Sequence, residues 1–331
     1  MPINPGTMRG TTLVTGGAGY VGSLLVADLL ARGRSVRVLD SLLHGSVPSL
    51  LGPFGHERFE FVHGDVRDAD AVRAAVDEVE AVVHLAAIVG DPACARDEDT
   101  ARNVNHGATL GLLDAAEAAG VRRFLFASTC SNYGKLADGD EVATEEWELR
   151  PLSVYAESKV AAELEVLGRN RDGFETACLR LATVYGASPR MRFDLTVNEF
   201  TRDVALGGSL VVYGEQFWRP YVHVRDAAAG FALALDAPAE LLGGQVFNVG
   251  SSEENYRKLD LVELLRERFP ALDVEYVHRD EDPRDYRVSF EKIATVLGYG
   301  PERTVADGVD EVIRLLESRI IEDPHAAVYR N

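Results

Sequence analysis

The chain has 331 residues, of which 46% are hydrophobic and 26% charged, so it is long enough to bury a large core. Its formal net charge of -19 argues against nucleic acid and anionic membrane surfaces as partners, because both are negatively charged. The three cysteines, Cys94, Cys130 and Cys178, have no metal-ligand spacing. We therefore expect no metal site and no disulfide framework, and the cysteine content suits a reducing compartment.

The N-terminal segment lacks the basic-then-apolar pattern of a signal peptide. No apolar run reaches the ~18 residues that a membrane span needs. These features predict a cytoplasmic protein without a membrane segment. Either Met1 or Met8 can serve as the start of the chain.

From Thr11 onward, short apolar or β-branched runs alternate with longer helix-patterned stretches, as in β-α units wound into a parallel sheet. The expected strands are 11–15, 35–40, 59–65, 81–87, 123–129 and 176–184. Six such units predict an α/β fold with a Rossmann-type, doubly wound parallel sheet.

The rhythm changes after residue 186, where a helix over 194–206 and a strand over 245–251 are expected. We expect residues 1–186 to form the Rossmann domain, with return segments near 220–250. Residues 187–331 would then form a smaller region that binds substrate at the carboxyl ends of the strands.

Four glycines follow the first expected strand in "VTGGAGYVGS": Gly16, Gly17, Gly19 and Gly22. Glycines there allow a tight turn and let the backbone approach a pyrophosphate at the N-terminus of the next helix. A glycine-rich turn of this kind also occurs for structural reasons alone.

Asp40 ends the second expected strand, 21 positions after Gly19. A carboxylate at this place accepts hydrogen bonds from the adenosine ribose and repels a 2′-phosphate. No arginine follows at positions 41–43. The pattern therefore favours NAD over NADP, and the alternative is that Asp40 is only a turn residue.

Tyr155 and Lys159 in "YAESK" are four residues apart, so a helix places both on one face. A nearby ammonium favours the phenolate form of a tyrosine, whose unperturbed pKa is about 10, and so favours its use as a base. The alternative is an exposed pair on a helix surface.

Together these motifs resemble the extended short-chain dehydrogenase/reductases of the NAD-dependent epimerase/dehydratase family, over nearly the whole chain. Further matching segments are "GDVRD" (64–68), "HLAA" (84–87), "NVNHGATLGLLDAA" (103–116), "STCSNYG" (128–134), "LRLATVYG" (179–186), "RPYVHVRDAA" (219–228), "FNVGS" (247–251) and "DPRDYRVSFEKIATVLGY" (282–299). The resemblance implies that Tyr155 is the catalytic base, that Lys159 supports it, and that Thr129 completes the triad.

The resemblance also implies two sets of binding residues. Those for NAD are Gly16, Gly19, Tyr20, Val21, Gly22, Asp40, Asp65, Val66, Leu85, Ala86, Ala87, Asn105, Tyr155 and Lys159. Those for a nucleotide-diphosphate sugar are Thr129, Cys130, Ser131, Thr183, Tyr185, Arg192, Asn198, Trp218, Arg219 and Arg284. Asn198, Arg219 and Arg284 match positions that hold the diphosphate in relatives, although a surface salt bridge is an alternative for the arginines. Thr183 stands where many members have asparagine. Relatives further imply a homodimer formed through helices near 100–119 and 153–169.

The residues after Thr129 bear on the type of reaction. Family members that eliminate water typically have Asp-Glu or a glutamate there, and decarboxylating members usually keep the glutamate, whereas this chain has Cys130 and Ser131. Members that epimerise C3 and C5 use a cysteine one place later together with a histidine, and no histidine lies between His106 and His223. The pattern favours a nucleotide-sugar 4-epimerase. A 4,6-dehydratase with a carboxylate from elsewhere, a 4-ketoreductase and an NAD-binding regulatory protein without turnover remain alternatives.

Overall fold

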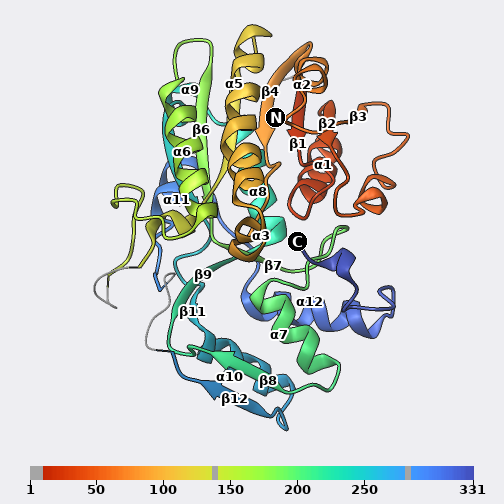
Figure 1. Ribbon diagram of the computed structural model, residues 1–331, viewed down its shortest axis with the longest axis vertical. Coiled ribbons are helices and arrows are strands. Elements are labelled where there is room, and N and C mark those ends of the chain that lie inside the picture. The colour runs from red at the N-terminus through yellow and green to blue at the C-terminus, as the bar shows by residue number, and fades with distance from the viewer. Residues whose placement is uncertain (1–9, 136–140, 280–284) are drawn as a thin grey trace.

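The computed structural model describes residues 10–135, 141–279 and 285–331. Its centre is a seven-stranded parallel sheet with the strand order β10-β6-β5-β4-β1-β2-β3 (Figure 1). The strands are β1 (Thr11–Thr15), β2 (Val36–Asp40), β3 (Phe59–His63), β4 (Val79–His84), β5 (Arg123–Thr129), β6 (Glu175–Leu181) and β10 (Gln245–Val249). This order reverses direction at β1, as in a Rossmann sheet. The prediction of a doubly wound parallel sheet is confirmed.

The central strands are buried along nearly their whole length because both of their faces are covered. Every residue of β5 is buried, and β1 is buried from its second residue on. A parallel sheet with helices on both faces requires this continuous pattern. The edge strand β3, by contrast, contains no buried residue.

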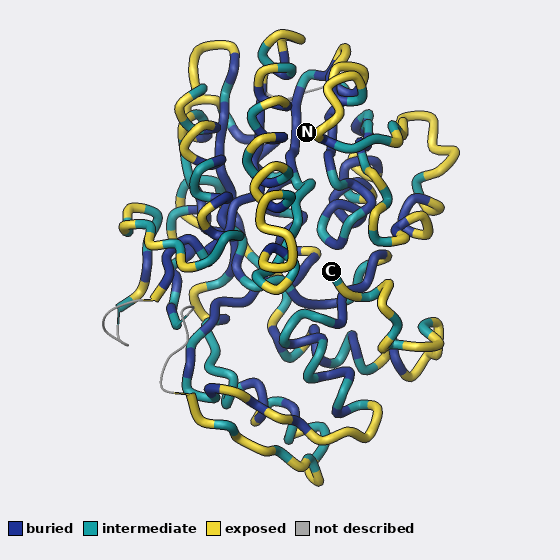
Figure 2. The backbone as a smooth tube through the Cα atoms, in the orientation of Figure 1, coloured by how far each residue is buried: buried dark blue, intermediate teal, exposed yellow. Residues whose placement is uncertain are grey.

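Two layers of helices cover the sheet. One face carries α1 (Gly22–Ala31), α8 (Val224–Asp236) and α11 (Glu291–Leu297), whose apolar side chains share one core. The other face carries α2 (Ala69–Val76), α5 (Ala108–Ala118) and α6 (Val154–Gly168). Figure 2 shows the buried strands between helices whose outer faces are exposed. None of the described helices is long and apolar enough to cross a bilayer.

A second region lies beyond the carboxyl ends of the large sheet (Figure 1). It contains a three-stranded sheet and a two-stranded one, with a core of its own that includes Tyr185 and Val305. Its elements are β7 (Thr183–Tyr185), α7 (Thr196–Ala205), β8 (Leu210–Tyr213), β9 (Trp218–His223), β11 (Asn255–Arg257), α10 (Lys258–Arg268), β12 (Val274–Val277) and α12 (Val305–Glu317). The short α9 (Ala239–Leu242) precedes β10.

The single strand expected over 176–184 is two strands in the structure. β6 ends at Leu181 in the large sheet, and β7 pairs with β9 in the second region. Ala182 joins them, and its amide still donates to the Val249 carbonyl at 3.1 Å. The expectation of one strand was wrong because a continuous strand-like run does not reveal where the chain changes sheets.

The chain then returns to the large sheet. After β9, helix α8 packs against α1, and β10 pairs with β6 as the edge strand. The two regions are therefore connected by several crossings of the chain, and the space between them is fixed from both sides.

Candidate active site

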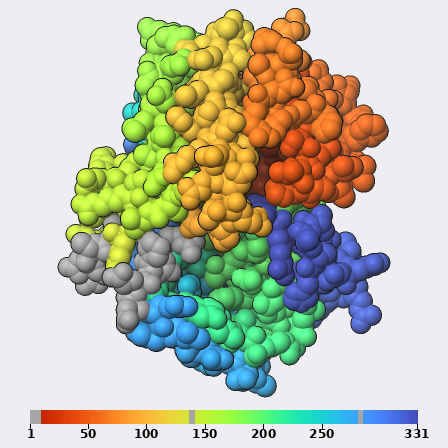
Figure 3. Space-filling model, viewed as in Figure 1, coloured from red at the N-terminus to blue at the C-terminus, as the bar shows by residue number. Residues whose placement is uncertain are grey.

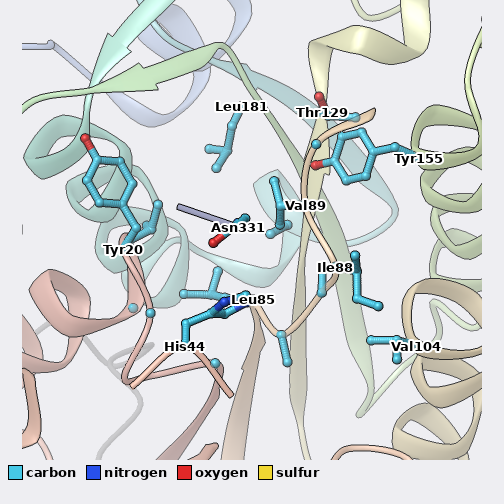
Figure 4. Close-up of a pocket in the computed structure, with 18 of the residues that line it drawn as sticks. Tyr20, His44, Leu85, Ile88, Val89, Val104, Thr129, Tyr155, Leu181 and Asn331 are labelled. Atoms are coloured by element: carbon cyan, nitrogen blue, oxygen red, sulfur yellow. The ribbon is translucent and has the colours of Figure 1, made fainter. Parts of the chain in front are cut away.

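A cavity of about 400 Å³ lies between the large sheet and the second region, at the carboxyl ends of β1, β2, β4 and β5. This volume is within the range usual for ligand sites. Open parallel sheets bind ligands at this edge, where the strand order reverses. Figure 4 shows side chains from both halves of the chain around the cavity.

The glycine loop forms one wall. Gly16 has φ +70°, and a Cβ there would lie 2.8 Å from the Ala86 nitrogen, so only glycine fits. A Cβ on Gly22 would collide with the Gly16 carbonyl oxygen. Helix α1 therefore starts directly against the loop, and its N-terminus faces the cavity, where it suits a phosphate group.

Asp40 lies at the end of β2 and lines the same cavity. Its carboxylate accepts hydrogen bonds from the amides of Leu42 at 2.8 Å and Ala18 at 3.0 Å. Burial raises the pKa of this carboxyl above its usual value, and the two amide bonds oppose the shift. Asp40 thus fixes the glycine loop against β2 while it remains at the cavity wall.

The predicted NAD residues surround the cavity with one exception. Those that line it are Gly16, Gly19, Tyr20, Val21, Gly22, Asp40, Asp65, Val66, Leu85, Ala86, Ala87, Tyr155 and Lys159. Asn105 does not line it, because its buried amide bonds both backbone groups of Ile88, at 2.8 and 2.9 Å. Asn105 belongs to a π-helical turn, Asn103–Gly107, between α4 (Glu98–Arg102) and α5. It therefore supports the wall from behind.

Thr129, Tyr155 and Lys159 come together at the other end of the cavity. Thr129 is the last residue of β5, and α6 presents Tyr155 and Lys159 one turn apart. Figure 4 shows the hydroxyl ends of Thr129 and Tyr155 close to each other. The Ser153 hydroxyl caps α6 by accepting from the Ala156 amide, and so fixes where the helix begins.

The two titratable groups of this triad are shifted by burial. Burial raises the pKa of the Tyr155 phenol, whereas the charge of Arg192 and a hydrogen bond with Thr129 lower it. Burial lowers the pKa of Lys159 to about 8. The ammonium lies 4.5 Å from the centroid of the Phe126 ring, an arrangement that favours the charged form. Tyr155 is therefore neutral here, and positive charge is needed to make it a base.

Ser131 and Tyr286 face each other beside Thr129. Their hydroxyl oxygens are 3.3 Å apart, and both residues line the cavity. Tyr286 was not predicted as a site residue, because it lies in a separate segment near the C-terminus. The guanidinium group of Arg219 stacks on the Tyr286 ring, 5.7 Å from its centroid.

Several predicted sugar residues lie elsewhere. Cys130 is fully buried, and its thiol donates to the Arg180 carbonyl at 3.3 Å. Tyr185 is fully buried against His223 and Tyr221 in the core of the second region. Neither lines the cavity, because the turn after Thr129 and the β6-to-β7 crossing direct their side chains inward.

Asn198, Trp218 and Arg219 also lie outside the cavity wall. The Asn198 amide donates to the Tyr20 hydroxyl at 3.0 Å and accepts from the Gly186 amide at 2.9 Å, so it holds the wall rather than forming it. Trp218 packs under the guanidinium groups of Arg257 and Arg287. Arg219 lies behind Tyr286 and donates to the Trp218 carbonyl. Arg284 lies outside the described residues.

Thr183 and Arg192 do line the cavity, together with residues that the sequence did not single out. Arg192 forms a two-point ion pair with Asp194, at 3.0 and 2.6 Å. The additional lining residues include His44, Asp91, Arg190, Tyr286 and Asn331. Arg190 stands two residues before Arg192, which is a weak signal, whereas nothing in the sequence places Asn331 near residue 44. No group of three His, Cys, Asp or Glu side chains suited to a metal ion occurs in the described ranges.

Comparison with known proteins identifies the family of the chain. Residues 12–250 match the model of the NAD dependent epimerase/dehydratase family. The chain is 31% identical to a UDP-glucose 4-epimerase from Mycolicibacterium smegmatis, over 93% of this chain and 99% of that protein.

Two solved structures extend the similarity to the fold. The dTDP-glucose 4,6-dehydratase DesIV from Streptomyces venezuelae, solved with NAD, has a TM-score of 0.83 and 31% identity over 93% of this chain and 98% of that one. The UDP-glucose 4-epimerase of Thermus thermophilus in complex with NAD has a TM-score of 0.79 and 31% identity over 94% of this chain and 100% of that one.

The protein belongs to the NAD-dependent epimerase/dehydratase family. The predicted family is thereby confirmed, and so is NAD as the cofactor of its members. Both epimerases and dehydratases are among the relatives, so family membership alone leaves the reaction open.

Proposed function

We propose that this protein inverts the C4 centre of a nucleotide-diphosphate sugar, using NAD, with Thr129, Tyr155 and Lys159 as its catalytic residues. The observation that carries the proposal is the pair of side chains after Thr129. Cys130 is buried away from the cavity with its pKa raised by burial, and Ser131 offers a hydroxyl paired with Tyr286. Neither can serve as the acid and base that elimination of water requires.

The residues present suit NAD. The glycine loop has no space for a Cβ at Gly16 or Gly22, so its backbone can approach a pyrophosphate closely. Asp40 offers a carboxylate to the ribose at the end of β2. When bound, NAD accepts a hydride from the sugar carbon and can return it. The glycine loop and α1 would hold the pyrophosphate, Asp40 the adenosine ribose, and Lys159 the ribose next to the nicotinamide.

The protein residues move the proton. Tyr155 would take the proton of the C4 hydroxyl, with Thr129 hydrogen-bonded to the same phenol. The phenol needs nearby positive charge because burial raises its pKa. Arg192 opposes this rise, and the Lys159 ammonium on the next helical turn would add to its effect. Inversion would then need rotation of the oxidised sugar, and the small hydroxyl side chains of Ser131 and Thr183 would leave space for it.

A 4,6-dehydratase is the second candidate, and one residue favours it. Among the described residues that line the cavity, the acidic ones are Asp40, Asp65 and Asp91. Asp91 begins α3 (Asp91–Arg96) and accepts from the Ser153 hydroxyl at 2.7 Å, two residues before Tyr155. A carboxylate in this position could replace the missing acidic pair.

An assay in deuterated water separates the two reactions. Purified protein without added cofactor is mixed with a panel of nucleotide sugars and followed by NMR, with Tyr155→Phe as the inactive control. We expect a C4 epimer without solvent deuterium, because the same hydride leaves and returns. A 6-deoxy-4-keto product carrying deuterium would refute the epimerase, and loss of that product in Asp91→Asn would identify the acid.

We further propose that the protein acts as a homodimer through α5 and α6. These helices pack against each other, and Leu164 on α6 is 62% exposed. Light scattering should give the mass of a dimer for wild type and of a monomer for Leu164→Glu, because an unpaired charge buried in the interface is strongly unfavourable. A variant with the wild-type mass would place the interface elsewhere.

A further inference from the structure

The C-terminal segment runs from the end of α12 to the cavity. Helix α12 ends at Glu317, a single 3₁₀ turn follows at Ala327–Tyr329, and Asn331 lines the cavity. In Figure 3, the blue C-terminal residues lie directly against the red and orange N-terminal unit. In Figure 4, Tyr20, His44 and Asn331 lie toward one side of the cavity, and Thr129 and Tyr155 lie toward the other. We call residues 327–331 the C-terminal strap.

One side of the strap is fastened to residues 190–194. The Phe193 amide donates to the Tyr329 carbonyl at 2.9 Å, and the two rings pack edge to face with centroids 5.8 Å apart. The backbone amide of Asn331 donates to the Asp194 carboxylate at 3.2 Å. A backbone hydrogen bond, a contact between two rings and a hydrogen bond to a carboxylate thus attach the strap to residues 193 and 194.

Arg190 ties the strap to the cavity wall. Its guanidinium donates to the Arg330 carbonyl at 3.0 Å and to the Asn331 side-chain oxygen at 2.8 Å. Arg190 is only 6% exposed, and a buried guanidinium needs acceptors for its five N–H groups. The strap supplies two of these acceptors, so the wall and the strap depend on each other.

The other side of the strap reaches the loop after Asp40. A Cβ built on Gly45 would lie 3.2 Å from a methyl group of Val328, so the two segments are in contact. Leu43, His44 and Ser46 of this loop line the cavity. The strap therefore bridges two walls, the loop that follows Asp40 and the segment that contains Arg190, at the end of the cavity where Asp40 lies.

We propose that the C-terminal strap is part of the cofactor site: it closes the adenosine end over bound NAD, and it must detach before NAD can leave. The inference rests on the proposed function and deepens it, because an epimerase that returns the same hydride must keep its cofactor through the whole cycle. Chemically, the strap recognises no base or sugar. It retains whatever dinucleotide the glycine loop and Asp40 have bound.

Release of NAD tests the strap directly. Full-length protein is loaded with radiolabelled NAD and chased with excess unlabelled NAD, and the bound label is followed by rapid filtration. Tyr329→Ala weakens the fastening without changing a residue that lines the cavity. We expect it to release NAD about tenfold faster than wild type, because it loses the ring contact and loosens the neighbouring hydrogen bonds.

A control variant and a second test variant make the result specific. His325→Ala changes an exposed side chain of the preceding segment and should release NAD at the wild-type rate. Asn331→Gly removes the amide that lines the cavity and should also accelerate release. Thermal unfolding of each cofactor-free variant checks that the fold is kept: Tyr329→Ala and Asn331→Gly should unfold at a slightly lower temperature than wild type, because they lose contacts with buried Phe193 and Arg190, but in a single transition.

A release rate for Tyr329→Ala equal to that of wild type would overturn the proposal. If Asn331→Gly nevertheless accelerated release, the effect would come from direct contact with NAD rather than from closure. Neither result depends on the sugar reaction, because the chase contains only NAD. A strap that controls release in a protein without epimerase activity would refute only the proposed function.

Discussion

The two ends of the cavity are built on different principles. One end, at which we expect the adenosine part of NAD and which we call the adenosine end, is formed largely by the backbone of the glycine loop and the start of α1, with the carboxylates of Asp40 and Asp65. The other end, at which we expect the sugar and which we call the sugar end, is formed by side chains from β5, α6, the β6-to-β7 crossing and residues near Tyr286. Backbone accommodates a dinucleotide common to a whole family, whereas side chains can vary with the substrate and the reaction. The adenosine end therefore defines the family, and the sugar end must decide the chemistry.

The largest expected effect separates the two ends. Tyr155→Phe should lower turnover about a thousandfold, within the usual range for loss of a general base, while NAD stays bound, because the glycine loop and Asp40 are unchanged. Parallel measurements of epimer formation and of NAD binding by calorimetry check this. Loss of NAD binding in this variant would show that the two ends are not independent.

The next effect concerns Asp40. Asp40→Asn keeps an acceptor for the loop amides but loses the charge, so NAD should bind about ten- to a hundredfold more weakly, as expected for a hydrogen bond to a charged group. NADP should lose less, and the preference between the two should narrow. Equilibrium titration with both dinucleotides measures this. Unchanged discrimination would contradict the ribose assignment.

A smaller effect is expected at the sugar end. Tyr286→Phe removes the hydroxyl that pairs with Ser131, and the KM for the nucleotide sugar should rise about fivefold, as expected for one neutral hydrogen bond. NAD affinity should not change. The matched variant Tyr256→Phe loses a hydroxyl away from the cavity, where it bonds Glu254, and should keep the wild-type KM. Equal effects in both variants would argue against a sugar contact.

The last and smallest effect is the pH dependence that Lys159 gives to the stability of the cofactor-free protein. Burial lowers the pKa of Lys159 to about 8, so its signal in a ¹³C-lysine NMR titration of the cofactor-free protein should move near pH 8. Because the unfolded chain holds this proton up to a pKa of about 10.5, the group adds stability as pH rises between these values. The chain has four lysines, and the missing signal in Lys159→Met gives the assignment. A midpoint near 10.5 would mean that the ammonium is solvated.

Much of the adenosine end could be predicted because its signals are local. Gly16, Gly22 and Asp40 stand at fixed places after β1 and β2, and each is required there by sterics or charge. Tyr155 and Lys159 follow from one helical turn in the same way. Asn105 was predicted to line the cavity, but it lies behind the wall residue Ile88. A sequence match does not say which face of a π-helical turn meets the cavity.

The parallel sheet, the glycine loop and the spacing of Tyr155 and Lys159 can all be inferred from the sequence, since periodicity and short-range geometry act within a few residues of the chain. Three features require the folded structure: Cys130 and Tyr185 point into cores, Tyr286 meets Ser131, and Asn331 reaches the wall beside Arg190. These contacts join segments more than a hundred residues apart, or depend on which way a turn directs a side chain. The physical reason is that packing between distant elements, and not the local pattern, selects the face on which such a residue lies.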